Sequence, residues 1–441
     1  MPPSQCRNSR LAVCTTLKKA FTCYSKSPPI YLDSNIVKIQ SRQTTFYQLP
    51  LLHHNFTTTF TAMDINHSNF SYRDRLQSSP QTTFQPRCLS PANTHIHIRR
   101  FSNSTTNCPS PTSTISTPVP QRTTIPKMAS VDSQDFKLAL SKHNLTSDHL
   151  KKIHDLLVEI AIDGGKIMVA AEHSVLAAAQ YKNNTSDLVT EFDKQIEDTV
   201  ETRLRKEYPV FGFLGEETFK HGTKLADTPT FVCDPIDGTL NFSKGVPNCA
   251  ISLALTLEKK PIIGVVYNPF RGDLYHAIKG QGAYLKNTLI GTEIKLPIQP
   301  MPPPMPSLNS CLVAIEWGNQ RSGENWALRT SIHNKLLTSK SEGGAMCKSV
   351  RTNGSAALDF CYIAQGIIDV FWEGGVWIWD VCAGWIILEE AGGIVASANP
   401  GDWDPSLEGR VYFAVRHAKP EEQKAVVEEL WGIMGDRKFV F

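Results

Sequence analysis

Two carboxylates follow a short apolar run in the segment Phe231-Val-Cys-Asp-Pro-Ile-Asp-Gly-Thr-Leu-Asn-Phe242. The run predicts a short strand from Phe231 to Cys233 that leads directly into Asp234 and Asp237, because Pro235 interrupts a helix or a ladder and Gly238 permits a tight turn. Thr239 stands where a helix could begin, with free backbone N–H groups. Carboxylates beside free amides suit a phosphate held through divalent metal ions. The segment alone also fits an ordinary Asp-rich turn with a helix cap.

Three further carboxylates have related surroundings. Glu216 and Asp380 each follow an apolar run, with Asp380 expected just before a helix, and Asp193 ends the segment Asp187-Leu-Val-Thr-Glu-Phe-Asp193. Taken singly, each reads as a solvated turn carboxylate or a helix cap. Together with the first pair they would form a site for several magnesium ions, since Mg²⁺ prefers hard oxygen ligands in octahedral geometry.

The sequence gives little support for a protein nucleophile. It shows no Ser-His-Asp pattern, and Cys233 lacks a following Arg loop, so we expect this cysteine to be a packed strand residue. His154, His173 and His276 have no ligand-like spacing and are expected to be structural or exposed. Phosphate monoesters need accelerations on the order of 10²¹-fold, whereas one general base supplies about 10²–10⁴-fold. Metal ions and an attacking water would therefore carry the reaction.

Several motifs resemble the inositol monophosphatase family. The segment 234–242 is similar to its first signature, and Trp379-Asp-Val-Cys-Ala-Gly-Trp-Ile-Ile-Leu-Glu-Glu-Ala-Gly-Gly393 is similar to its second. Gly215-Glu-Glu217, and Asp187-Leu-Val-Thr190 followed by Asp193, have the order and spacing of that family. The resemblance covers roughly residues 145–430 and implies a magnesium-dependent, lithium-sensitive phosphatase with two or three Mg²⁺ ions, acting as a homodimer.

Carried over position by position, the resemblance implies a role for each site residue. The first magnesium would be bound by Glu216, Asp234 and the carbonyl of Ile236, the second by Asp234, Asp237 and Asp380, and a weaker third by Glu216. The attacking water would be oriented and activated by Thr239 with Glu216, and Asp193 would support that base.

The resemblance also implies the substrate contacts. The amides of Gly238 and Thr239 would hold the phosphate next to Asp237. Glu373 matches the position that contacts inositol hydroxyls, and Ala356 matches a backbone contact to the ring. Ser355 stands where Thr is commoner, and Lys182 matches a basic position near the metals.

The substrate has alternatives within the same superfamily. Histidinol phosphate, 3'(2'),5'-bisphosphate nucleotides and fructose bisphosphate are handled by relatives that share the Asp-Pro-Ile/Leu-Asp-Gly core. The ending Thr239-x-Asn241-Phe242 and Glu373 favour inositol monophosphate or a similar polyol phosphate. A catalytically silent scaffold is disfavoured because every expected ligand is present. Nucleic-acid binding is disfavoured because the N-terminal basic residues are scattered, with few aromatics among them.

The pattern of elements predicts an α/β (α+β) protein. We expect helices from Thr146 towards Gln180, broken near Gly164-Gly165, and over 187–205. Strands are expected at 211–214, 250–257, 261–267 and 273–278, with 281–284 continuing the meander. After an exposed connection at 296–307, strands are expected at 311–315, 367–372, 394–398 and 411–414, and helices at 325–337, after Gly354, at 381–391 and at 421–430.

The resemblance implies that these elements form a layered α-β-α-β-α sandwich of the sugar-phosphatase type. Residues 128–305 would form an N-terminal α+β half that carries most metal ligands. Residues 306–441 would form a C-terminal α/β half that carries Asp380 and the substrate wall.

Residues 1–127 differ from the rest of the chain. They hold 14 Lys and Arg, three Asp and no Glu, a net charge of +11, whereas the whole chain carries +3, so residues 128–441 carry −8. Rich in Ser, Thr and Pro, they predict a disordered basic tail. This tail is either a mitochondrial presequence or an over-extended start, with translation beginning at Met128. We favour the over-extended start, and with it a cytoplasmic location of the protein.

Neither a membrane span nor a disulfide framework is expected. The longest apolar runs fall short of about 18 residues. The eleven cysteines have no regular spacing, which indicates buried free thiols in a reducing compartment.

Overall fold

The computed structural model describes residues 134–171, 180–181, 188–189 and 191–441. The predicted N-terminal tail lies outside these residues, as do Lys182, Asp187, Thr190 and His173. The helices are α2 Gln134–Lys142, α3 Ser147–Ala171, α5 Glu191–Glu207, α6 Thr239–Lys244, α7 Gly323–Leu337, α8 Ala356–Gln365, α9 Ile378–Glu390 and α10 Pro420–Met434, with 3₁₀ turns η2 Leu308–Ser310 and η3 Lys340–Glu342.

Strands β3 to β9 form a seven-stranded sheet in sequence order. They are β3 Gly212–Gly215, β4 Thr230–Asp237, β5 Ala250–Leu257, β6 Lys260–Asn268, β7 Asp273–Ile278, β8 Ala283–Asn287 and β9 Thr292–Lys295. β3 and β4 are parallel, and every later neighbour is antiparallel. The short strands β1 Gln180–Tyr181 and β2 Leu188–Val189 pair separately.

The second sheet has five strands in the order β11-β10-β12-β14-β13. They are β10 Leu312–Ala314, β11 Ser349–Arg351, β12 Val370–Gly374, β13 Ile394–Ala396 and β14 Val411–Val415. β10 runs parallel to β11 and β12, whereas β14 runs antiparallel to β12 and β13.

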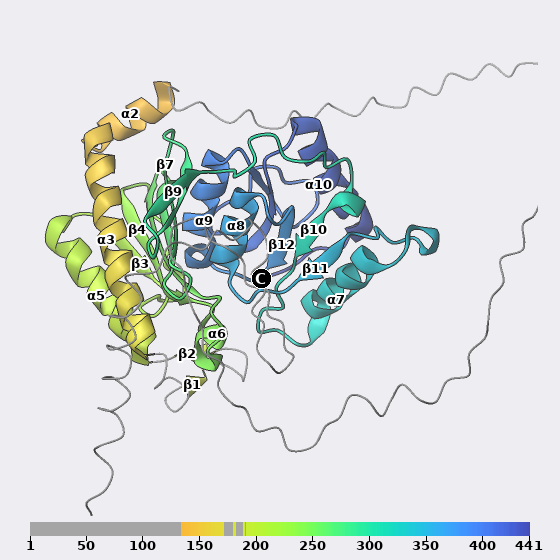
Figure 1. Cartoon of the computed structure of the whole chain (residues 1–441), viewed down its shortest axis with the longest axis horizontal. Helices are drawn as coiled ribbons and strands as arrows, with labels where there is room; N and C mark the ends of the chain where they lie inside the picture. The colour runs from red at the N-terminus through yellow and green to blue at the C-terminus, as the bar shows by residue number, and fades with distance from the viewer. Residues whose placement is uncertain (1–133, 172–179, 182–187, 190) are drawn as a thin grey trace, which may run out of the picture. The chain divides into compact units, whose positions relative to one another are not determined.

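The helices and the two sheets form five layers (Figure 1). One core joins α3 and α5 to the seven-stranded sheet, a second packs α8 and α9 between the sheets, and a third joins the five-stranded sheet to α7 and α10. Phe231 and Cys233 of β4 face the first core, and Val232 faces the second. Because β4 is covered on both faces, its apolar residues run on without a polar alternation. The predicted α-β-α-β-α sandwich is confirmed.

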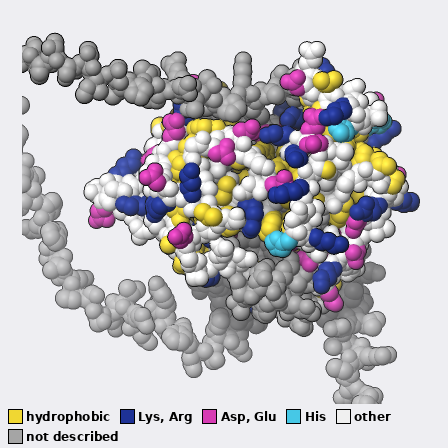
Figure 2. All heavy atoms as spheres, turned by 180° about the vertical axis from the view of Figure 1, so that it is seen from behind, with side chains coloured by type: hydrophobic (Ala, Val, Ile, Leu, Met, Phe, Trp, Pro, Cys, Tyr) yellow, Lys and Arg dark blue, Asp and Glu magenta, His cyan; other side chains and the backbone are white. Residues whose placement is uncertain are grey.

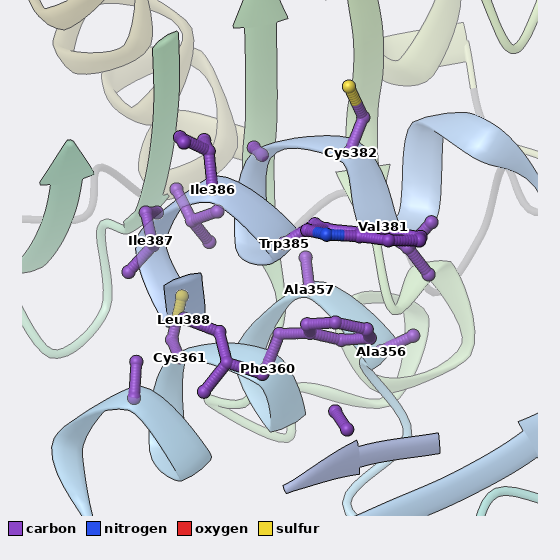
Figure 3. Packing of buried hydrophobic residues seen from close by; sticks show 14 of the residues in the cluster. Ala356, Ala357, Phe360, Cys361, Val381, Cys382, Trp385, Ile386, Ile387 and Leu388 are labelled. Carbon is purple, nitrogen blue, oxygen red and sulfur yellow. The ribbon is translucent and has the colours of Figure 1, made fainter. Parts of the chain in front are cut away.

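The middle layer is unusually apolar because both of its helices are enclosed. Phe360 of α8 lies close to the backbone of α9, where a Cβ at Gly384 would stand 2.5 Å from the Cβ of Phe360. Figure 3 shows Leu388 of α9 beside Phe360, whereas Ile386 lies on the opposite side of α9, where a Cβ at Gly264 of β6 would meet it. The close packing fixes the N-terminal ends of both helices, which contribute to the site described below.

The predicted helix break at Gly164-Gly165 is wrong, since α3 is continuous through both glycines. A Cβ at Gly165 would stand 2.5 Å from Cε1 of Tyr267. The glycines therefore let the helix approach the sheet, and this packing outweighs the helix cost of glycine, about 1 kcal/mol each.

Other boundaries also differ from the predictions. Residues 188–189 are a strand, so the second helix begins at Glu191. β9 was not expected, and β4 continues through Asp237 instead of ending at Cys233.

The described residues combine a surface of mixed charge with buried free thiols. Lys and Arg side chains are interspersed with Asp and Glu on the face shown in Figure 2. The six cysteines after residue 133, all described, are free and buried. Among the described residues, none of the helices combines the length and apolar character needed to cross a membrane.

Candidate active site

Three carboxylates converge where the two halves of the fold meet. Oxygen atoms of Asp234, Asp237 and Asp380 all lie within 4.8 Å of one another. Asp234 and Asp237 are buried, and Asp380 is partly buried. Buried like charges at this separation repel one another, a bound cation would relieve this repulsion, and an all-carboxylate set suits Mg²⁺. The residues therefore fit the metal that the resemblance implies.

A bulge in β4 lets Asp234 and Asp237 share the site. Asp234 pairs with Ser252 of β5 and Asp237 with Ala250, so β4 has one extra residue between the two pairs. Residues three apart in a regular strand face opposite sides, and the extra residue restores a common side. The backbone N–H of Ile236 donates to Oδ1 of Asp234 at 3.0 Å, which fixes the turned segment.

Asp237 is held by the beginning of α8, from the other half of the fold. Its Oδ2 accepts hydrogen bonds from Oγ of Ser355 at 2.5 Å and from the N–H of Ala357 at 2.8 Å. Burial nevertheless raises the pKa of Asp237 to about 7, with the charges of Glu216 and Glu316 acting in the same direction. The predicted backbone contact, Ala356, lies between these two donors at the first position of α8.

Asp380 lies within the first turn of α9, whereas the sequence placed it before the helix. Its Oδ2 accepts from the N–H of Trp377 at 2.5 Å, which positions the carboxylate at the helix N-terminus. Burial and the charges of Asp237 and Glu216 raise the pKa of Asp380 well above its usual range. The pKa of Asp234 is also raised well above its usual range, by burial first and then by Glu216.

Glu216 follows β3 and extends the pairing of β3 with β4. Its N–H donates to the carbonyl of Cys233 at 3.1 Å. Its charge raises the pKa values of Asp234, Asp237 and Asp380, so it stands near the carboxylate cluster but outside the group of three within 4.8 Å.

Glu197 was missed by the sequence reasoning. Its carboxylate accepts from the N–H groups of Glu217 and Thr218, both at 2.8 Å, and thereby fixes the turn that carries Glu216. It is 1% exposed, and Gly215 leaves the space that it occupies. The sequence feature that could have revealed Glu197 is its position four residues after Asp193, which places it on the buried side of α5 together with Asp193 and Ile196.

Thr239 and Asp193 are brought together as the resemblance implies. Oγ1 of Thr239 lies 3.3 Å from Oδ1 of Asp193 and 3.0 Å from the carbonyl oxygen of Ile236. The hydroxyl has one proton, so it donates to one of these acceptors at a time and keeps its lone pairs for a further donor. The carbonyl of Ile236 has a second lone pair available to a metal ion.

Gly238 is required by the turn between β4 and α6. Its φ is +92°, and a Cβ there would stand 2.8 Å from the carbonyl oxygen of Gly354. Only glycine combines this conformation with this close approach.

Glu373 lies in β12 and is 1% exposed. Its Oε2 has no hydrogen-bond partner among the described residues. Burial and the charge of Glu316 raise its pKa well above its usual range, and the nearby Arg329 guanidinium opposes this. A buried carboxyl oxygen without a partner costs free energy, which a substrate hydroxyl would recover.

Asn353 joins the two halves beside the site and was also missed. Its carbonyl accepts from Nδ2 of Asn241 at 2.7 Å and of Asn248 at 2.8 Å. Its own N–H donates to Glu316 at 2.5 Å, and its Nδ2 donates to Asp359 at 2.6 Å. The sequence offered Asn241 within the first signature but no signal for its partners.

The family of this chain follows from its similarity to known proteins. The model of the inositol monophosphatase family matches residues 149–434. Inositol monophosphatase 2 of Saccharomyces cerevisiae is 41% identical over 293 residues, which cover 65% of this chain and 96% of the yeast protein. The quinic acid degradation cluster protein x of Neurospora crassa is 32% identical over 332 residues, 66% of this chain and 96% of that protein.

This chain is also similar in structure to a solved protein. The extragenic suppressor protein suhB of Bartonella henselae has a TM-score of 0.52 and 26% identity, covering 64% of this chain and 98% of that one. The chain belongs to the inositol monophosphatase family. This membership confirms the predicted family and the predicted inositol-phosphate phosphatase class.

Proposed function

We propose that this chain is a magnesium-dependent phosphomonoesterase that hydrolyses inositol monophosphate to inositol and phosphate. The observation that carries the proposal is the convergence of Asp234, Asp237 and Asp380 within 4.8 Å. The matching relatives, among them the yeast protein named inositol monophosphatase 2, support the substrate.

The metal ligands divide into two main sets. Asp234, Glu216 and the carbonyl of Ile236 would hold one ion, Asp234, Asp237 and Asp380 a second, and Glu216 a weaker third. Magnesium, when bound, supplies neutralising charge for the phosphate oxygens and lowers the pKa of bound water.

The remaining residues orient the reacting groups. Thr239 donates to Asp193 or to the carbonyl of Ile236, so its hydroxyl oxygen can accept a hydrogen bond from the attacking water. The N–H groups of Gly238 and Thr239 would hold the phosphate. The water oxygen bonds to phosphorus as the ester P–O bond breaks. The attacking water gives up one proton towards Glu216 and Thr239, and the leaving alkoxide takes up one proton, so that inositol and phosphate are released. Most of the rate comes from this positioning and from charge stabilisation.

Glu373 would select the substrate. Its Oε2, which has no partner among residues 191–441 and the other described residues, would accept a hydrogen bond from a ring hydroxyl, and the backbone at Ala356 would contact the ring from α8. The Neurospora relative, named for quinic acid degradation, favours a second candidate, another phosphorylated polyhydroxy ring.

Phosphate release from a substrate panel tests the proposal. The panel contains inositol monophosphates, histidinol phosphate, fructose bisphosphate, adenosine bisphosphate and an aryl phosphate, each with magnesium or with a chelator. We expect magnesium-dependent release led by inositol monophosphate, and loss of release in Asp234→Asn with the fold retained. Full activity in that variant would refute the metal assignment, and inactivity of the wild type on every substrate would favour a silent scaffold.

Two family properties extend the proposal. We propose a homodimer, tested by light scattering, and inhibition by lithium, tested by titration at fixed magnesium.

A further inference from the structure

Two histidines far apart in the sequence meet on the surface of the seven-stranded sheet. His154 of α3 and His276 of β7 have their ring centroids 4.9 Å apart. Nε2 of His154 lies 3.0 Å from Nδ1 of His276. Their side chains are 12% and 13% exposed, so both rings are largely buried but still reach the protein surface. The sequence, which found no ligand-like spacing, did not predict this pair.

A carboxylate contacts the outer nitrogen of each ring. Nδ1 of His154 lies 3.0 Å from Oδ1 of Asp155, and Nε2 of His276 lies 3.2 Å from Oε1 of Glu293. The result is a chain of three contacts: carboxylate to ring, ring to ring, and ring to carboxylate. Tyr284 stacks on His276 at 5.7 Å and limits the movement of its ring.

The three contacts need more protons than two neutral imidazoles provide. Ionised carboxylates only accept hydrogen bonds, and each neutral imidazole has one N–H. When both outer nitrogens donate to Asp155 and Glu293, the two inner nitrogens face each other with lone pairs at 3.0 Å. The arrangement is completed by one more positive charge between these inner nitrogens.

A third proton is disfavoured by the surroundings. Burial lowers the pKa of His276 to about 4, with the charge of His154 acting in the same direction, and burial also lowers the pKa of His154. The charges of Lys286 and Lys151 act against protonation, while those of Glu293 and Asp155 favour it. At neutral pH both imidazoles are therefore neutral, and each has one nitrogen with a lone pair.

We propose that His154 and His276 form a binding site for a divalent transition-metal ion such as Zn²⁺, separate from the carboxylate cluster. Neutral imidazole nitrogens bind zinc at about 2.0–2.1 Å, which in a tetrahedral site separates two of them by about 3.3 Å, close to the 3.0 Å found here. Carboxylates on the outer nitrogens orient the rings, as they do around zinc-bound histidines. Water would complete the coordination.

The site is remote from the proposed reaction centre. β7 is the third strand beyond β4 in the sheet, about 14 Å away at ordinary strand spacing. Zinc bound there would connect α3 to the sheet, and its binding does not depend on phosphatase activity.

Zinc stoichiometry at buffered free zinc, with excess magnesium present, tests the proposal. The variants are His154→Ala and His276→Ala, with His149→Ala as the matched control because His149 is exposed on the same helix. We expect the first two to bind one zinc ion fewer than the wild type and the control to bind the same number. Glu293→Gln should weaken this zinc by about 10–100-fold. Zinc can also bind the adjacent residues His53 and His54, so the test rests on the difference in bound zinc between each variant and the wild type.

A second measurement needs no variant. Zinc added to the wild type should shift the ring ¹⁵N resonances of His154 and His276, assigned through the variants or through their mutual contact. Unchanged resonances, or equal stoichiometry in all variants, would overturn the proposal and leave the pair as a hydrogen-bonded contact only.

Discussion

Asp237→Asn should stabilise the metal-free protein while abolishing its activity. Burial raises the pKa of Asp237 from its ordinary 3.8 to about 7. A difference of about three units corresponds to on the order of 4 kcal/mol for ionising this carboxyl in the folded protein. The asparagine has no charge to bury, and its carbonyl oxygen can still accept from Ser355 or Ala357.

The pH dependence follows from the direction of this shift. Because the folded protein holds the proton of Asp237 more tightly than the unfolded chain, the stabilisation is complete below about pH 4. It is lost as the pH rises through about 7. The advantage of Asp237→Asn should therefore be small at pH 4–5 and reach its maximum, at most about 4 kcal/mol, near pH 8.

Thermal or urea unfolding in a chelator at pH 5 and pH 8 measures this difference. Asp404→Asn, at a side chain that is 74% exposed, is the matched control and should change little. With magnesium added, the wild type should gain stability and Asp237→Asn should not. The turnover of Asp237→Asn should fall by more than about 100-fold, since loss of a residue that only supports a metal ligand already lowers metal affinity or activity by about 10–100-fold. Equal stability of variant and wild type at pH 8, or a difference independent of pH, would refute the reasoning.

Three further substitutions test single contacts. Glu373→Ala should lower kcat/KM for inositol monophosphate at least tenfold more than for an aryl phosphate, and equal losses would remove Glu373 from the substrate wall. Gly238→Ala should cost about 1–3 kcal/mol in urea unfolding and lower kcat, because its φ is +92° and the added Cβ meets Gly354; wild-type stability would contradict this. Gly165→Val should cost about 1–3 kcal/mol by crowding Tyr267 while sparing kcat, and an unchanged unfolding midpoint would show that the helix can move away.

Local patterns in the sequence identified the α/β class and the carboxylates, and the resemblance to the family identified the layered sandwich. Asp234 and Asp237 stand in one short segment, and Asp380 follows an apolar run that had to be enclosed. Glu197 and Asn353 were missed because of where their partners lie. Glu197 accepts from backbone N–H groups about 20 residues further on, and Asn353 binds side chains from the other half of the fold, and no residue pattern records such partners. The pairing of His154 with His276 depends on how α3 crosses the sheet.

The glycines of α3 show a different limit. Glycine has a low helix propensity, so Gly164-Gly165 predicted an interruption. The sheet against which the helix packs decides the outcome, because Tyr267 leaves no room for a Cβ at Gly165. Propensity describes a residue in isolation, whereas this position is determined by its neighbour.

The division of the carboxylate cluster between the two halves has a consequence for biosynthesis. A ribosome releases a chain from its N-terminus, so Asp234 and Asp237 emerge well before Ser355 and Asp380. Until residue 365 has left the exit tunnel, the nascent chain lacks α8, which holds Asp237, and until residue 380 has left, it lacks the third carboxylate of the cluster. A chain terminated before Asp380 would therefore lack the complete cluster, so this enzyme can assemble its three carboxylates only when its synthesis is nearly finished.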